Sequence, residues 1–407
     1  MIAGDTAWIL ISTALVMLMT PGLALFYGGM VRKKNILSTM MMSFGVLAVI
    51  GVLWVLFGYT LAFGPDKGGI IGGLDWIGLR NVGQDPSSTY ATTVPHLAFM
   101  MYQGMFAIIT VALITGAVVE RIKFSSLLIF SVLWFTLIYC PVAHWVWGSG
   151  GWLAELGALD FAGGIVVHIT AGVSAVALAL ILGPRKGFAQ KQTMEPANIP
   201  MVALGAALLW FGWFGFNAGS ALTSGGLAAN AFVATNTAAC TAAFTWMLLG
   251  WIYRRPSLLG AATGAVVGLA AVTPAAGFIT PMASIPIAVV AALISYYVMI
   301  LRSKQNVDES LDVWACHAMG GTWGALATGI FASVAVNAAG ADGLAYGGAI
   351  LLAKQAAAVA VVWIFSFVGT WVLAKIVKAV FGLRVKDEEE MVGLDISQHG
   401  ERAYGGL

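Results

Sequence analysis

Two histidines stand inside apolar stretches that are long enough to cross a membrane. His168 lies in residues 160–175, and His317 lies in residues 312–324. Ionisable side chains are costly inside membrane-length segments and usually mark a functional pathway. A pair of neutral imidazoles can share one hydrogen bond and still offer a donor or acceptor to a small polar molecule. We therefore predict a pore or binding pathway built around His168 and His317.

Each histidine also has a structural explanation. A lone histidine in an apolar helix commonly packs against the next helix through a hydrogen bond. Two histidines could alternatively bind a metal ion in a membrane-embedded enzyme, but no carboxylate or cysteine cluster stands at ligand spacing near either one. Because the two histidines occupy matching places in similar segments, we favour a shared pathway. We predict no metal, no cofactor and no enzymatic activity.

Each of these segments begins with an acidic residue. A carboxylate at the start of a helix accepts hydrogen bonds from free backbone N–H groups and interacts favourably with the helix dipole. We interpret Asp312 as such a cap. Asp160 precedes two glycines on the helix that carries His168. We predict that it is a buried carboxylate that orients backbone carbonyls or sets the electrostatics of the external mouth.

The composition identifies the environment of these segments. The 407 residues are 60% hydrophobic and 9% charged, whereas roughly 25% of residues are charged in an average soluble domain. Such a chain is a polytopic all-α membrane protein. The net charge of +2 gives no indication of nucleic-acid binding. The three cysteines lie in apolar segments without a CxxC pair, and we interpret them as small core residues: Cys140, Cys240 and Cys316.

Apolar runs of spanning length predict eleven transmembrane helices. They fall at about residues 7–31, 37–63, 97–119, 124–146, 161–183, 199–219, 228–252, 258–276, 283–301, 312–334 and 347–379.

The basic residues orient these spans. An odd number of spans places the termini on opposite sides, and Lys and Arg concentrate on the cytoplasmic side. With the N-terminus outside, seventeen of the twenty basic residues, Arg254 among them, fall in cytoplasmic loops, at the end of the last helix or in the tail. Only Lys67 and Arg80 fall outside, and Lys354 lies within the last span. We predict an N-out, C-in topology.

The chain contains a faint internal repeat. The first and sixth spans share an aromatic–glycine texture, and the fifth and tenth each begin with Asp and contain a histidine. Paired spans five apart cross the membrane in opposite directions, which is the pattern of an inverted repeat with its site near the midplane. We divide the chain into a transmembrane domain, 1–380, with pseudo-repeats at about 1–183 and 199–334, and a polar cytoplasmic tail, 381–407.

Several aromatic residues from different spans lie toward the predicted external face. Trp and Tyr at such positions are often simple interface anchors, but several rings together with a hydroxyl could form a cation cage. Each cation–π contact contributes ~0.5–2 kcal/mol, which is enough to gather a cation and far too little to carry it through an apolar pore. The cation must therefore lose or spread its charge before it passes the histidines. The candidate side chains are Phe106, Trp147, Trp213, Phe216 and Ser220.

Longer motifs then give the chain a family resemblance. They include F-Y-G-G-M-V-R-K-K-N, Y-Q-G-M-F, A-V-V-E-R-I-K-F-S, A-H-W-V-W-G-S-G-G-W, L-D-F-A-G-G-I-V-V-H, G-W-F-G-F-N-A-G-S-A and, in the tail, G-L-D-I-S-Q-H-G-E-R-A-Y. In this order they resemble the ammonium transporter (Amt/Mep/Rh) family over essentially the whole chain. The tail resembles that of the prokaryotic Amt branch.

The resemblance implies a role for each candidate residue. Phe106, Trp147 and Ser220 would form the external ammonium recruitment site, and Phe106 with Phe216 would form a gate below it. His168 and His317 would be the twin-histidine pair of a hydrophobic pore whose wall includes Trp213. Asp160 would be the buried acid needed for ammonium recognition or deprotonation. Tyr102 stands where many relatives have phenylalanine, so it is not assigned to the site.

The resemblance also implies an assembly and partners. We expect a homotrimer with one pore per protomer in the cytoplasmic membrane, with ammonium or ammonia as substrate and methylammonium as an analogue. The tail resembles the segment that docks a PII-type signalling protein. An ammonium sensor that signals through such a partner with little flux is the alternative function.

Overall fold

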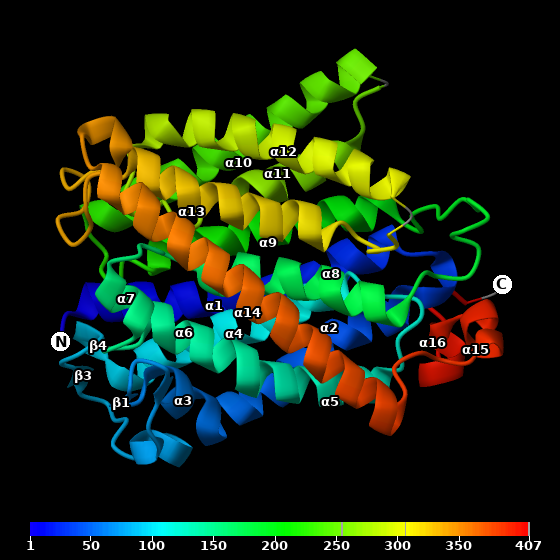
Figure 1. Ribbon diagram of the computed structural model, residues 1–407, viewed down its shortest axis with the longest axis horizontal. Helices are drawn as coiled ribbons and strands as arrows, with labels where there is room; N and C mark the ends of the chain where they lie inside the picture. Colours follow the sequence, from blue (N-terminus) through cyan, green and yellow to red (C-terminus); the bar gives the residue numbers. More distant parts are fainter. Residues whose placement is uncertain (254, 306, 406–407) are drawn as a thin grey trace.

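The computed structural model describes residues 1–253, 255–305 and 307–405 as a bundle of long helices. Figure 1 shows most of these helices running along one axis, with the two termini at opposite ends of the bundle. This arrangement agrees with an odd number of crossings. Arg254 and the last two residues of the predicted tail, 406–407, lie outside the described residues.

Nine helical segments of the described chain are long and apolar enough to span a membrane. They are α1 (Ala3–Met30), α2–α3 with its flanking turns (Lys33–Phe63), α4 (His96–Thr115), α5–α7 (Phe124–Leu156), η5–α8 (Gly164–Leu182), α9 (Ile199–Gly219), α10 (Gly226–Tyr253), η6–α12 (Pro281–Lys304) and α14 (Ala349–Phe381). Two shorter helices occupy the remaining predicted spans: α11 (Leu258–Val272), and α13 (Met319–Phe331) preceded by the turn η7 (Trp314–Ala318). The helix α11 ends two residues before Pro274, which cannot continue a helix.

Several spans contain a π-helical turn. In the described chain these turns are η2 (Trp54–Gly58) between α2 (Ile36–Leu53) and α3 (Tyr59–Phe63), η4 (Phe135–Tyr139) between α5 (Phe124–Trp134) and α6 (Cys140–Trp147), η5 (Gly164–Ile169) before α8 (Thr170–Leu182), and η7 before α13. Single π turns inside helices often occur at functional sites. Both candidate histidines lie on such turns, His168 on η5 and His317 on η7.

Short elements cover the N-terminal end of the bundle. They are the hairpin of β1 (Asp66–Lys67) and β2 (Ile71–Gly72), the turn η3 (Leu74–Leu79), the hairpin of β3 (Pro86–Ser87) and β4 (Ala91–Pro95), the helix α7 (Trp152–Leu156) and the turn η8 (Leu344–Tyr346). The buried His144 side chain bonds to the Ala62 carbonyl and, at 2.9 Å, to the Asp66 carboxylate. The predicted external loop is therefore an ordered cap that is fastened to the helices.

Glycines allow the two halves of the chain to pack closely. The first helices of the halves, α1 and α9, contact each other where a Cβ atom at Gly205 would overlap the backbone nitrogen of Phe26. The histidine-bearing segments cross where a Cβ atom at Gly172 would overlap the backbone nitrogen of Ala318. Small residues permit such backbone approach in membranes, where lipid supplies no hydrophobic drive for helix association.

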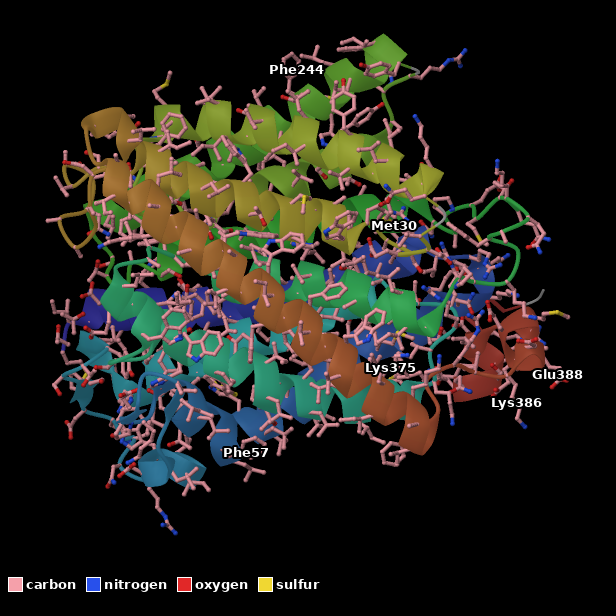
Figure 2. The ribbon with its side chains drawn as sticks, in the orientation of Figure 1. Met30, Phe57, Phe244, Lys375, Lys386 and Glu388 are labelled. Carbon is pink, nitrogen blue, oxygen red and sulfur yellow. The ribbon has the colours of Figure 1, made fainter. Side chains whose placement is uncertain are left out.

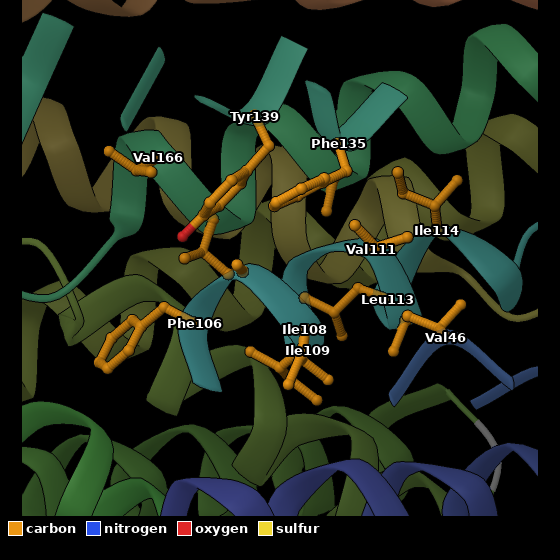
Figure 3. Close-up of a cluster of buried hydrophobic side chains, with 14 of the residues drawn as sticks. Val46, Phe106, Ile108, Ile109, Val111, Leu113, Ile114, Phe135, Tyr139 and Val166 are labelled. Carbon is orange, nitrogen blue, oxygen red and sulfur yellow. The ribbon is translucent and has the colours of Figure 1, made fainter. Parts of the chain in front are cut away.

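The core of the first half is built around α4, which is buried over nearly its whole length. Figure 3 shows its side chains, including Phe106 and Ile109, packed with Phe135 and Tyr139 of η4 and Val166 of η5. This packing fixes α4, and therefore Phe106, against the segment that carries His168.

The tail forms two short helices, α15 (Asp387–Val392) and α16 (Leu394–His399), at the C-terminal end of the bundle. The buried Glu390 carboxylate accepts from the Lys186 N–H at 2.6 Å and from Arg384 at 2.6 Å. The Asp395 carboxylate accepts from the Ser38 N–H at 2.7 Å. Figure 2 shows the exposed members of this segment, Lys386 and Glu388, pointing away from the bundle. The tail is thus packed on the basic loops.

The outer surface of the bundle is apolar. Phe244 on α10 projects away from the other helices in Figure 2 and is 53% exposed, as expected for a side chain that faces lipid. Cys140 and Cys316 are buried, as predicted, but Cys240 is exposed on α10. The prediction of a core position for Cys240 was wrong, because an apolar span does not reveal which of its faces is turned outward.

The close crossing at Gly172 generates a stability prediction. We expect Gly172→Ala to lower the unfolding temperature of the purified protein, because overpacking costs about 1–3 kcal/mol and the added methyl group meets backbone that cannot rotate away. The control is Gly226→Ala, where no heavy atom lies within 4 Å of the added carbon. Equal unfolding temperatures for the two variants would contradict the predicted crossing.

Candidate functional site

The two histidines meet in the middle of the bundle. Their Nδ1 atoms are 3.2 Å apart, the ring centroids are 5.1 Å apart and the rings are tilted by 24°. His168 is 1% and His317 is 3% exposed. A hydrogen bond between two Nδ1 atoms requires that one ring donates and the other accepts. The Nε2 atoms of a neutral pair are therefore unequal, with a lone pair on one ring and an N–H on the other.

A narrow apolar passage runs along the histidine pair. Its cavity measures about 10 Å³, which is close to the smallest space that holds one water molecule. Trp213 stacks on His168 with centroids 5.4 Å apart, and its indole N–H donates to the Thr273 hydroxyl. The passage is lined by Met19, Leu23, Phe26, Ile109, Leu113, Val167, His168, Leu209, Trp213, Phe216, Val266 and His317.

A wider and more polar vestibule lies beyond Phe216. Its cavity of about 230 Å³ is lined by Phe106, Trp147, Asp160, Ser220 and neighbouring aromatic residues. The Phe106 ring meets Trp147 edge-on at 5.9 Å and lies 4.2 Å from Phe216. Phe216 in turn stacks on His168 at 5.9 Å. Ring contacts thus run from Trp147 in the vestibule through Phe106 and Phe216 to His168.

The Ser220 hydroxyl contacts two groups of the protein. Its hydroxyl donates to the Phe216 carbonyl at 2.9 Å, and it lies 3.1 Å from the Tyr102 hydroxyl. The sequence analysis left Tyr102 out of the site because the residue type departs from many relatives. Only the packing of α4 against the end of α9 brings the two hydroxyls together, and no sequence signal marks that contact.

Asp160 binds backbone N–H groups at the start of η5, so the prediction that it orients backbone carbonyls was wrong, because an ionised carboxylate can only accept hydrogen bonds. Its two carboxylate oxygens accept four N–H bonds, at 2.7–3.0 Å, from Gly163, Gly164, Ile165 and Val166. The Asp160 carbonyl accepts from the Trp147 indole N–H at 2.8 Å. Asp160 therefore connects the segment that carries His168 to an aromatic wall of the vestibule.

Asp312 is not the cap of the second histidine segment. Its carboxylate pairs with Arg302 at 2.8 Å. The cap is Glu309, which is fully buried and accepts from the N–H groups of Val313 and Trp314. The interpretation of Asp312 was wrong because we took the acid nearest to the apolar run. The spacing pointed to Glu309, since both Asp160 and Glu309 stand eight residues before their histidine.

The capping segment at Glu309 is fixed by ionic contacts. Asp308 pairs with Arg185 at 2.8 Å, and Arg185 also lies 3.6 Å from the Glu120 carboxylate. Burial by itself raises the pKa of the Asp308 carboxyl, but hydrogen bonds from Arg185 and the charges of Arg121 and Arg185 hold that pKa below its usual value. Asp308 therefore stays ionised. Within the described ranges, no three His, Cys, Asp or Glu side chains are arranged to hold a metal ion.

Comparisons with known proteins identify the family of the chain. The family model described as Ammonium Transporter Family matches residues 7–404. The chain is 53% identical to the ammonium transporter of Bacillus subtilis over 98% of both chains. It is 52% identical to ammonium transporter Amt1 of Archaeoglobus fulgidus over 98% of this chain and 99% of that one.

Solved structures share the fold. The Candida albicans Mep2 structure superposes with a TM-score of 0.90 at 37% identity, covering 98% of this chain and 90% of that one. A structure described as a sensor Amt protein superposes with a TM-score of 0.88 at 27% identity, covering 97% and 98%. The identities are higher to the bacterial and archaeal relatives than to the fungal structure. The chain belongs to the ammonium transporter family, a family of membrane transport proteins, and resembles its prokaryotic Amt members.

Proposed function

We propose that this protein carries ammonium across the cytoplasmic membrane by admitting it as a cation and passing it onward as ammonia. The observation that carries the proposal is the order of three environments. A vestibule of rings and oxygens is followed by two phenylalanine rings in contact and then by a narrow apolar passage beside two histidines.

The vestibule suits a small cation that donates hydrogen bonds. Phe106 and Trp147 offer ring faces and edges at its floor, and each cation–π contact contributes ~0.5–2 kcal/mol. The Ser220 hydroxyl already gives its proton to the Phe216 carbonyl, so its lone pairs remain to accept from ammonium. We assign Phe106, Trp147 and Ser220 to ammonium recruitment.

The phenylalanine pair separates the cation from the passage. With the rings of Phe106 and Phe216 4.2 Å apart, no path is open between them. We propose that they form a gate that opens by ring rotation, and that ammonium gives up its proton at this point. The reason is energetic, because a bare ion in a dry, low-dielectric passage costs tens of kcal/mol in the idealised limit, whereas neutral ammonia does not carry that cost.

The histidine pair then matches ammonia. Ammonia donates and accepts hydrogen bonds, and the two Nε2 atoms of the neutral pair provide one acceptor and one donor. Trp213 supports the His168 ring by stacking. We assign Asp160 chiefly to structure, because its four accepted hydrogen bonds hold η5 and leave the carboxylate engaged.

The assembly and the partner of the tail extend this proposal. The vestibule and the passage are both lined by a single chain, which supports one pore per protomer. We propose that the protomers assemble as a homotrimer in the lipid bilayer. The tail, 381–407, is a separate regulatory segment at the cytoplasmic face, and its exposed acidic residues on α15 are available to a PII-type protein. Methylammonium should be an alternative substrate.

A sensor with little flux is the second candidate function. The observation that favours it is the full-length likeness to a structure described as a sensor Amt protein. Uptake of labelled methylammonium by vesicles that contain the purified protein separates the two candidates. Uptake well above that of protein-free vesicles supports transport, and binding without uptake supports the sensor.

The histidine pair generates the first functional prediction. We expect His168→Ala to reduce methylammonium uptake by about tenfold or more, or to admit potassium, because the passage loses one of its two imidazoles. His96→Ala is the control, since His96 is buried in the external cap and bonds to Tyr59. Unchanged uptake and unchanged exclusion of potassium by a correctly assembled His168→Ala protein would refute the proposed pathway.

The Asp160 cap generates a second prediction. In Asp160→Asn an amide nitrogen replaces one accepting oxygen, so up to two buried N–H groups lose their partner at about 1–3 kcal/mol each. We expect a lower unfolding temperature together with reduced uptake. A stable variant whose uptake changes only in its pH dependence would instead indicate a titrating role for Asp160.

A further inference from the structure

The Tyr102 hydroxyl contacts Ser220, one of the polar residues that line the vestibule. Tyr102 is fully buried on α4. Its hydroxyl oxygen is 2.8 Å from each of the carbonyl oxygens of Gly215 and Phe216 and 3.1 Å from Ser220 Oγ. We infer that Tyr102 is a positioning residue that keeps the Ser220 oxygen turned toward the cation as a hydrogen-bond acceptor. This inference rests on the proposed recruitment of ammonium at Ser220.

The arrangement of protons carries the argument. Each of the two hydroxyls has one proton, and the acceptors within reach are the carbonyls of Gly215 and Phe216 and the other hydroxyl. Every pairing that gives both protons an acceptor directs the Ser220 proton to Phe216 or to Tyr102. The proton therefore points into the protein, and a lone pair of Ser220 remains on the vestibule side.

The contact also transmits the polarity of a helix end. Gly215 and Phe216 belong to the last turn of α9, which ends at Gly219. The carbonyls at the C-terminal end of a helix carry partial negative charge and favour a nearby cation. Ser220 and Tyr102 both orient their hydroxyls on these carbonyls, so the hydroxyl dipoles continue this polarity toward the vestibule.

Loss of the Tyr102 hydroxyl should therefore weaken cation binding without blocking passage. In Tyr102→Phe the Ser220 proton retains only the Phe216 carbonyl as an inward acceptor, and the hydroxyl rotates more easily toward the vestibule, where its proton repels a cation. The aromatic ring remains, so its edge-on contact with Phe106 at 4.9 Å is preserved. The residue acts through Ser220 and has no assigned contact with ammonia in the passage.

The test is a double-mutant cycle on uptake of labelled methylammonium by vesicles. The proteins compared are wild type, Tyr102→Phe, Ser220→Ala and the double variant. Tyr59→Phe is the matched control, because it also removes a buried tyrosine hydroxyl, one that bonds to His96 away from Ser220. KM and maximal rate are measured for each protein, and thermal unfolding of each protein checks the fold.

We expect Tyr102→Phe to raise KM about threefold to tenfold, a change typical for weakening one hydrogen bond to a charged group, with a nearly unchanged maximal rate. Ser220→Ala should raise KM at least as much, and the double variant should match Ser220→Ala, because the two residues act as one unit. Tyr59→Phe should leave KM unchanged.

Three outcomes would overturn the inference. An unchanged KM in Tyr102→Phe, or a double variant whose effect is the product of the two single effects, refutes positioning through Ser220 and leaves recruitment at Ser220 intact. An unchanged KM in Ser220→Ala refutes the recruitment role of Ser220 itself, and the inference with it.

Discussion

The backbone of a membrane helix must satisfy all of its N–H groups without water, and this constraint shapes the centre of the molecule. The two segments that carry the histidines begin inside the protein and start as π turns, so their first N–H groups lack intrahelical partners. Buried carboxylates satisfy them, Asp160 at η5 and Glu309 at η7. Each broken helix is therefore stable only with its own acid, and each histidine takes its position from that cap.

A second constraint, close approach of two backbones, explains how segments far apart in the sequence share one site. Segments that enter from opposite ends bring His168 and His317 within one hydrogen bond only if their backbones nearly touch. Gly172 permits that approach to Ala318, next to His317. The position of the two imidazoles thus depends on a glycine at the crossing and on a buried carboxylate at the beginning of each histidine-bearing segment. A bulkier residue or a missing acid would separate the imidazoles.

The sequence predicts the parts of this arrangement that depend on long apolar runs. The spans, the opposite ends of the termini and the two buried histidines follow from hydropathy and charge, because lipid imposes those patterns on every residue of a span. Contacts that depend on one side chain at an irregular backbone do not follow. Glu309 was missed although its spacing from His317 equals that of Asp160 from His168. Asp312 was taken as the cap instead, because it is the acid nearest to the apolar run, but it pairs with Arg302. The contact between Tyr102 and Ser220 depends on helix packing that no local pattern encodes.

The two capping carboxylates, Asp160 and Glu309, have different neighbours, so the two ends of the passage are not equivalent. Asp160 borders the vestibule and connects to Trp147 through its carbonyl. Glu309 follows Asp308, whose carboxylate pairs with Arg185, and the next residue, Lys186, donates its N–H to Glu390 in the tail. Asp160 thus contacts the aromatic wall of the vestibule, and Glu309 lies one residue from Asp308, whose contacts reach the tail. The two π-turn segments that carry the histidines therefore differ in their contacts, since one begins at the vestibule and the other begins beside residues that contact the tail.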